Sequence, residues 1–263
     1  MSGAGTYPDC VVVTGASSGF GAAIARRAAI GGARIVVIGR RLDRLREVAA
    51  PFGARAHVLQ ADVRDGAAFA EALQALPAPF DEVGLLVNNA GIGLGRDRAQ
   101  EARIADWLAM VETNVTGLIA GTQALLPGMV ARGSGHVINI GSLAAAFPTP
   151  RNAIYAASKA FMRQFAYCLR ADLLGTGVRV TTIEPGQSGG TEFTLVREHG
   201  DAARAEAAYG SNRLIGPDDV ADAIDWVVSR PAHVNVNLLQ LSSIDQAFGP
   251  LAFAASSRGM DHA

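Results

Sequence analysis

The sequence has 263 residues, 49% of them hydrophobic and 18% charged, which predicts a single large α/β domain over residues 1–263, with its core in residues 10–241 and a C-terminal tail in residues 242–263. The formal net charge of −1 excludes the strongly basic surface that nucleic acids or anionic membranes attract. The sequence shows neither a signal-peptide pattern nor an apolar run long enough to span a bilayer, so we expect a cytoplasmic protein with a small-molecule substrate.

Seven short β-branched runs alternate with helical stretches along the chain. They lie at residues 10–14, 33–39, 56–60, 83–88, 136–141, 178–184 and 236–241. Their apolar residues do not alternate with polar ones, which is typical of strands covered on both faces of a parallel sheet. A helix should begin near Gly19 and end at Gly31 and Gly32. The pattern predicts a Rossmann-type doubly wound sheet of about seven strands, with helices on both faces and ligands beyond the carboxyl ends of the strands.

A glycine-rich turn follows the first predicted strand, in the stretch TGASSGFGAAIA. A tight turn between a strand and a helix favours residues without Cβ, and the first amides of the helix can bind a pyrophosphate. Alone, the GxxxGxG spacing also suits an ordinary flexible loop, but its place in an alternating chain favours dinucleotide binding. The candidate cofactor residues of this turn are Gly15, Ser17, Ser18, Gly19, Phe20 and Gly21.

The end of the second predicted strand, in the stretch IGRRLDRL, indicates which dinucleotide is bound. A site for NAD would place an acidic residue here to bind the ribose hydroxyls, whereas Gly39 has no side chain. Arg40 and Arg41 offer guanidinium groups that suit a 2′-phosphate. Arg40 is the stronger candidate, because Arg41 could equally be solvated at the start of the next helix. We therefore expect NADP(H).

The cysteines and histidines give no sign of a disulfide or a metal site. Cys10 falls in a predicted strand and Cys168 in a predicted helix, so we expect two buried free thiols in a reducing compartment. The histidines show no metal-ligand spacing. They are His57, His136, His199, His233 and His262.

Tyr155 and Lys159 lie one turn apart on a predicted helix, among small residues, in the stretch NAIYAASKAF. Such a pair is often an ordinary surface contact. A free phenol has a pKa of about 10, however, and a nearby ammonium group favours the phenolate. We expect Lys159 to lower the pKa of Tyr155, and Tyr155 to exchange a proton with the oxygen of a carbonyl or alcohol. Ser142, just beyond a predicted strand, could hold that oxygen.

Several motifs occur together in the order that one enzyme family shows. They are the glycine turn, NNAG at residues 88–91, NVTG at residues 114–117, Ser142, and Tyr155 with Lys159. The chain therefore resembles the short-chain dehydrogenases/reductases, and most closely the bacterial NADP-dependent 3-hydroxy acid dehydrogenases. The resemblance implies a catalytic tetrad completed by Asn114, which supports a proton-relaying water, and a lysine that also binds the nicotinamide ribose.

The resemblance also implies further cofactor contacts. These are Asp62, Val63, Asn89, Ala90, Gly91, Pro185, Gly186, Ser188 and Thr191. Ser188 stands where the family usually has an aliphatic residue, so the packing of this loop should differ. Among the loops expected to wall the substrate pocket, Arg151 is our first candidate to bind a substrate anion, with Arg96 and Arg197 as alternatives. The polar stretch at residues 198–212 suits a mobile lid.

Three functions remain open at this stage. The leading one is NADP(H)-linked hydride transfer on a small polar 3-hydroxy acid or the corresponding aldehyde or ketone. The second is reduction of another carbonyl, either a small anionic aldehyde such as sulfoacetaldehyde or a bulkier ketone or aldehyde. The third, a cofactor sensor without turnover, is disfavoured by the intact tetrad.

The helix around Tyr155 also bears on assembly. It is apolar on more than one side: Ile154, Phe161 and Phe165 suit the core, whereas Tyr167 lies on another face. The resemblance implies a homotetramer that pairs this helix, the preceding long one, and the last helix–strand unit at residues 221–228 and 236–241.

Overall fold

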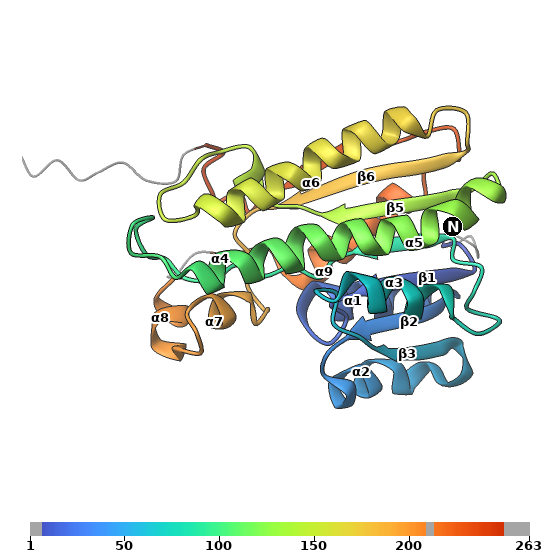
Figure 1. Cartoon of the computed structure of the whole chain (residues 1–263), viewed down its shortest axis with the longest axis horizontal. Helices are drawn as coiled ribbons and strands as arrows, with labels where there is room; N and C mark the ends of the chain where they lie inside the picture. The colour runs from blue at the N-terminus through green and yellow to red at the C-terminus, as the bar shows by residue number, and fades with distance from the viewer. Residues whose placement is uncertain (1–6, 209–212, 250–263) are drawn as a thin grey trace, which may run out of the picture.

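The computed structural model describes residues 7–208 and 213–249. Its centre is a sheet of seven parallel strands in the order β3-β2-β1-β4-β5-β6-β7 (Figure 1). The strands are β1 Cys10–Thr14, β2 Arg34–Gly39, β3 Ala56–Gln60, β4 Leu85–Asn88, β5 Gly135–Ile140, β6 Val178–Pro185 and β7 Leu238–Leu241. The order changes direction between β1 and β4, which leaves a crevice for ligands at the carboxyl ends of these two strands.

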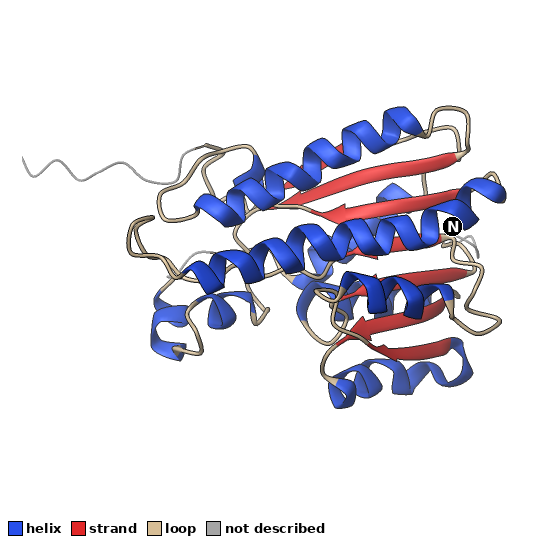
Figure 2. Ribbon diagram, viewed as in Figure 1, coloured by secondary structure: helices blue, strands red, loops and turns tan. Residues whose placement is uncertain are grey.

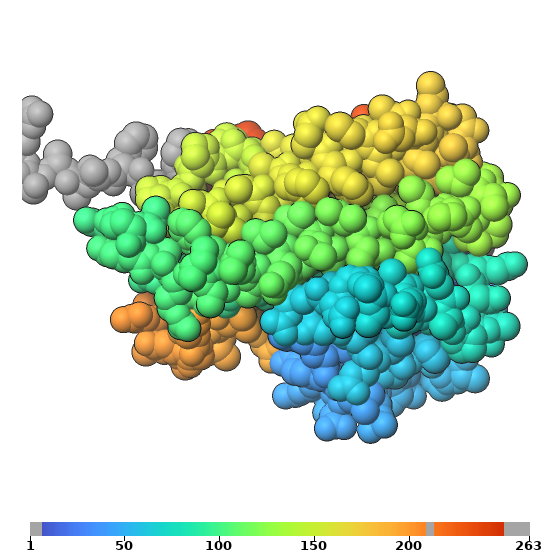
Figure 3. All heavy atoms as spheres, in the orientation of Figure 1, coloured from blue at the N-terminus to red at the C-terminus, as the bar shows by residue number. Residues whose placement is uncertain are grey.

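Helices cover both faces of the sheet (Figure 2). The α-helices are α1 Gly19–Ile30, α2 Leu42–Ala49, α3 Gly66–Gln74, α4 Ile104–Val111, α5 Gly117–Ala131, α6 Ala153–Asp172, α7 Phe193–Arg197, α8 Ala202–Ala207 and α9 Pro217–Val228. Helices α1, α2 and α9 contribute to the core on one face, and α3, α5 and α6 to the core on the other. Figure 3 shows α5 and α6 side by side across the second face.

The core explains why the strands read as unbroken apolar runs. Val11 and Val13 of β1 pack with α1 and α9, whereas Cys10 and Val12 pack with α3 and α5. All four side chains are fully buried. Because both faces of the sheet are covered, hydrophobic burial acts at every position along the strand, as expected for a parallel sheet.

All seven predicted strands are present, and β1 and β3 have the predicted bounds. Strand β4 begins at Leu85 instead of residue 83, because the chain before it forms a turn in which the backbone N–H of Val83 donates to the carbonyl of Asp81. Helix α1 ends at Ile30 with Gly31 as its C-cap residue, as predicted. No helix within the described ranges is long and apolar enough to cross a membrane.

Two burial predictions for α6 are wrong. Cys168 is exposed, although Cys10 is buried as predicted. Phe161 is 39% exposed. Helix α6 packs against the rest of the protein through the buried residues Met162 and Ala166, and Phe161, one position before Met162, lies on a different side of the helix. The stacked pair of Phe161 and Phe165 therefore lies at the outer side of the helix, with ring centroids 5.9 Å apart.

Candidate active site

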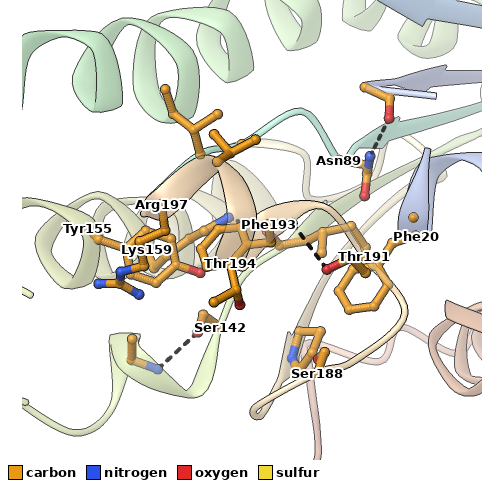
Figure 4. Close-up of a pocket in the computed structure, with 18 of the residues that line it drawn as sticks. Phe20, Asn89, Ser142, Tyr155, Lys159, Ser188, Thr191, Phe193, Thr194 and Arg197 are labelled. Atoms are coloured by element: carbon orange, nitrogen blue, oxygen red, sulfur yellow. Dashed lines mark hydrogen bonds between the residues drawn. The ribbon is translucent and has the colours of Figure 1, made fainter. Parts of the chain in front are cut away.

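A cavity of about 790 Å³ opens at the carboxyl ends of the strands. The loops that follow β1, β4, β5 and β6 line it, which is where open α/β sheets bind ligands. Figure 4 shows Phe20 and Asn89 at one end of this cavity and Tyr155 at the other. The cavity thus joins the glycine turn to the proposed catalytic pair.

The glycine turn has the backbone geometry that a pyrophosphate site requires. Gly15 and Gly19 have φ of 64° and 53°, in the left-handed region that favours glycine. A Cβ at Gly21 would overlap the carbonyl oxygen of Gly15, so the close approach of α1 to the turn also needs glycine. Ser18 precedes α1 without capping it through its side chain, which leaves the first amides of the helix available to an anion.

The NNAG segment holds this turn in place. The hydroxyl of Thr14 accepts hydrogen bonds from the backbone N–H groups of Asn89 (3.0 Å) and Ala90 (2.9 Å). The Asn89 amide donates in return to the carbonyl of Thr14 at 2.8 Å and to that of Gly15 at 3.2 Å. The ends of β1 and β4 are therefore locked together around the crevice.

Arg41 lies at the end of β2 and points to the glycine turn. Its Nη2 donates to the hydroxyls of Ser17 (3.0 Å) and Ser18 (2.9 Å) and to the Glu192 carboxylate (2.7 Å). The Ser18 hydroxyl donates to the same Glu192 oxygen at 2.9 Å. The bond from Arg41 holds the pKa of Glu192 below its usual value. These donors already hold one anionic oxygen, so the residues present fit a 2′-phosphate. Arg40 lines the cavity but makes none of these contacts.

Two other predicted cofactor residues lie after β3. Asp62 lines the cavity, and its carboxylate accepts hydrogen bonds from Arg64, which lower its pKa. Val63 is buried against Gly117, where an added Cβ would lie 2.8 Å from the Val63 Cβ. The start of α5 therefore packs directly on this segment.

Asn114 lies in a short π-helical segment, Glu112–Thr116, between α4 and α5. Such single turns often occur at functional sites. The Asn114 side chain accepts from the N–H of Ile92 (2.8 Å) and donates to the Ile92 carbonyl (2.9 Å) and the Ser158 hydroxyl (3.0 Å). It therefore ties the loop after β4 to α6. Gly91, in the loop after β4, lies close to both Asn114 and Lys159, because a Cβ added to it would lie 3.3 Å from Lys159 Nζ and 3.4 Å from Asn114 Oδ1.

Lys159 is 4% exposed and donates from Nζ to the carbonyl of Ile140 at 2.7 Å. Burial lowers the pKa of this ammonium group to about 8, with Glu184 acting in the opposite direction. Glu184 is fully buried and accepts two hydrogen bonds from Arg163, at 2.6 and 2.5 Å. The end of β6 thus places a paired carboxylate near Lys159.

Tyr155 is 9% exposed, and its ring centroid lies 5.8 Å from Lys159 Nζ. Burial raises the pKa of the phenol, whereas a hydrogen bond with Ser142 and the charge of Arg197 lower it. The chain's own groups therefore keep Tyr155 protonated at neutral pH, contrary to the expectation that its lysine neighbour lowers the pKa. The physical reason is that the desolvation of the phenolate outweighs the attraction of nearby cations. A protonated phenol is the form that donates a proton to a carbonyl oxygen.

The model of the short chain dehydrogenase family matches residues 9–200. The chain belongs to this family. It is 47% identical over 241 residues to the NADP-dependent 3-hydroxy acid dehydrogenase YdfG of Escherichia coli K12, covering 92% of this chain and 97% of that protein. It is 45% identical over 247 residues to sulfoacetaldehyde reductase 2 of Chromohalobacter salexigens, covering 93% and 98%. The closed form of a serine dehydrogenase complexed with NADP+ superposes with a TM-score of 0.89 at 47% identity, covering 90% and 96%.

The loop after β6 of this short-chain dehydrogenase lies on the glycine turn. A Cβ added to Gly19 would lie 3.2 Å from the side chain of Thr191. Ser188, the unusual residue here, donates its hydroxyl to the carbonyl of Gly186 at 2.9 Å, so its polarity is satisfied within the loop. The Gly186 backbone N–H donates to Leu241 at 2.8 Å, which fixes the start of the loop beside β7. Residues 209–212 of the expected lid lie outside the described residues, and its mobility stays a prediction.

The three candidate arginines have different environments. Arg96 is exposed, and its Nε donates to Glu198 at 2.5 Å. Arg151 is exposed at the edge of the cavity with a φ of 60°. Arg197, in contrast, is 9% exposed and lies beside Tyr155. Sequence reasoning placed Arg151 first because it is near Tyr155 along the chain, a signal that carries no information about burial.

Sequence reasoning missed Glu192 and Phe193. Glu192 reaches Ser18 and Arg41 from 174 and 151 positions away, and no local pattern shows such contacts. The ring of Phe193 lies 5.5 Å from that of Tyr155 and forms a wall of the cavity.

Proposed function

We propose that this chain is an NADP(H)-dependent oxidoreductase that transfers a hydride between the nicotinamide and a small polar 3-hydroxy acid or the corresponding aldehyde or ketone. The observation that supports this most strongly is the meeting of Ser142, Tyr155 and Lys159 in the cavity that also contains the glycine turn. The 3-hydroxy acid dehydrogenase and NADP+-bound relatives support the cofactor and the substrate class.

NADP(H), when bound, supplies or accepts the hydride. Glycine-turn amides, Ser18 and Arg41 would hold its phosphates, and Lys159 its nicotinamide ribose. Tyr155 donates its phenolic proton to the substrate oxygen during reduction, and Ser142, which lines the same cavity, holds that oxygen. Lys159, whose Nζ lies 5.8 Å from the Tyr155 ring centroid, stabilises the phenolate left behind, and Asn114 holds the loop that carries Gly91 beside Lys159.

A second candidate function is the reduction of sulfoacetaldehyde. A sulfoacetaldehyde reductase is among the relatives, and a buried guanidinium group beside Tyr155 suits a sulfonate as well as a carboxylate. A bulkier ketone is less well supported, because Phe193 and Arg197 both lie close to the phenol. A sensor without turnover would have no use for the buried pair of Tyr155 and Lys159.

The Tyr155→Phe variant tests the proposal. NADPH oxidation should be followed at 340 nm with malonic semialdehyde, sulfoacetaldehyde and neutral aldehydes, and NADP+ reduction with serine and 3-hydroxyisobutyrate. We expect losses of roughly 10²- to 10⁴-fold in kcat, the usual contribution of a general acid, with NADPH binding retained. Tyr167→Phe is the matched control, because Tyr167 lies on the same helix but is exposed. Full turnover in Tyr155→Phe would show that the reaction does not use this phenol.

We also propose that the protein is a cytoplasmic homotetramer. Two free cysteines suit a reducing compartment. Exposed apolar side chains occur on α4, α5 and α6. They include Leu108, Val111, Ile119, Phe161 and Tyr167. Figure 3 shows the segments of these helices lying together on one face of the molecule. Within residues 7–208 and 213–249, β7 is an edge strand of the sheet, and Trp226 of α9 is half-exposed, so this last helix–strand unit offers a second contact surface.

A further inference from the structure

Arg197, the last residue of α7, is a buried cation without an acidic partner. Arg197 is 9% exposed, and no carboxylate among the described residues lies within ion-pair distance of its guanidinium group. Its Nη2 donates to the side-chain oxygen of Asn152, but its Nε is buried and has no hydrogen-bond partner. Burial lowers the pKa of this guanidinium group. A buried, uncompensated charge is costly, which makes a missing anion the natural explanation.

The nearest acidic residue along the chain does not serve Arg197. Glu198 accepts a hydrogen bond from Arg96 at 2.5 Å, and its side chain is 9% exposed. The Arg197 backbone carbonyl accepts from Gly95 at 3.0 Å, so the loop after β4 holds α7 in place. The Arg197 backbone is thus held by Gly95 and its guanidinium group by Asn152, but neither contact neutralises the charge.

The location of the guanidinium group is close to the reacting atoms. Its Cζ lies 5.3 Å from the Tyr155 ring centroid and 5.9 Å from that of Phe193. Both Arg197 and Tyr155 line the same cavity, and Figure 4 shows them beside each other. A small molecule can therefore place its carbonyl oxygen at the Tyr155 hydroxyl while another of its groups contacts Arg197.

We propose that Arg197 binds the anionic group of the substrate and so selects short carbonyl compounds that carry a carboxylate or sulfonate one or two carbons from the reacting carbon. This inference rests on the proposed function and adds the residue that determines its specificity. The planar guanidinium fork binds such oxyanions through two parallel hydrogen bonds. Arg151, exposed at the edge of the cavity, lacks the desolvated setting that makes such a bond selective.

The test compares charged and neutral substrates in Arg197→Gln, Arg197→Lys and Arg151→Gln. The substrates are malonic semialdehyde and sulfoacetaldehyde against propanal, which has no anionic group. For Arg197→Gln we expect kcat/KM to fall roughly 10- to 100-fold for the two anions, the usual effect of losing a hydrogen bond to a charged group, and about threefold or less for propanal. Arg197→Lys keeps the charge but loses the fork, so its loss should be intermediate.

A binding measurement gives a readout that does not depend on turnover. The NADPH-bound protein should bind 3-hydroxypropionate as a dead-end ligand, followed by the change in NADPH fluorescence. Its dissociation constant should rise about tenfold or more in Arg197→Gln, while the dissociation constant for NADPH alone stays unchanged. If Arg197→Gln does not bind NADPH, its fold is damaged, and the same comparison in Arg197→Lys decides.

The outcomes separate this inference from the proposed function. If the wild-type protein reduces none of the aldehydes, the proposed function fails. If it reduces them but Arg197→Gln loses charged and neutral substrates equally, the function stands and the role of Arg197 is overturned. A selective loss of the anionic substrates in Arg151→Gln instead would assign the anion site to Arg151.

Discussion

The Glu192 carboxylate occupies donors that a 2′-phosphate needs. It accepts from Arg41 at 2.7 Å and from Ser18 at 2.9 Å. A phosphate bound at the same place must share or replace these bonds, and two anions so close repel each other. We therefore expect Glu192→Gln to bind NADPH more tightly than the wild-type protein, because the neutral amide competes less well for Arg41.

The size of this effect follows from the exposure of the pair. The Arg41 and Glu192 side chains are 46% and 43% exposed, so solvent screens their attraction. Exposed ion pairs contribute about 0.2–1 kcal/mol. Removing the competition should therefore tighten NADPH binding by roughly 1.5- to 5-fold. The gain should shrink at high ionic strength, because salt screens exposed charges.

Fluorescence titration of NADPH and NADH measures the change. The affinity for NADH, which has no 2′-phosphate, should change less than that for NADPH. Glu47→Gln is the matched control, since Glu47 is an exposed carboxylate paired with Arg44 on α2, outside the cavity. Weaker NADPH binding in Glu192→Gln would refute the reasoning and mean that this carboxylate orients Arg41 for the cofactor.

The kcat/KM for carbonyl reduction should fall as pH rises through about 8, the pKa of Lys159, because the ammonium form is lost, and a profile flat to pH 9.5 would contradict this. His136 is buried and its pKa is lowered to about 3, so below pH 6.5 the unfolded state binds a proton that the folded state does not. The free energy of unfolding in urea should therefore fall by about 2 kcal/mol between pH 7 and pH 5. The fall should be smaller in His136→Asn, which lacks the titrating group. Phe161→Lys places a charge on the proposed contact surface and should lower the sedimentation coefficient of the assembly. Ile30→Lys, at an exposed position on α1, should not change it. A wild-type monomer at micromolar concentration would contradict the tetramer.

The sequence was sufficient to predict the sheet because its inner strands, such as β1 and β4, are buried on both faces. Burial at every position produces an apolar run such as Cys10–Thr14 that any window of the sequence shows. The glycine turn was equally readable, because the positive φ of Gly15 and the close approach at Gly21 restrict the residue type locally. Where the backbone geometry admits only one residue type, that residue in the sequence predicts the local structure.

Contacts between distant segments could not be predicted in the same way. The partners of Glu192 and the burial of Arg197 depend on how the loop after β6 folds over the cavity. Likewise, the exposure of Phe161 depends on which side of α6 meets the sheet, and a helix that is apolar on several sides leaves this undetermined. The choice among Arg96, Arg151 and Arg197 could therefore be made only on burial and pairing.

Burial also shifts the pKa values of the proposed catalytic pair, Tyr155 and Lys159. It raises the pKa of the Tyr155 phenol and lowers that of the Lys159 ammonium group, so burial shifts each pKa toward the neutral form of its side chain. The phenolate needed for alcohol oxidation therefore depends on additional positive charge near the ring. Arg197 provides some of it and lowers the pKa of Tyr155. A substrate anion bound to Arg197 would cancel this contribution, so anionic substrates should keep the phenol protonated and favour the reduction step.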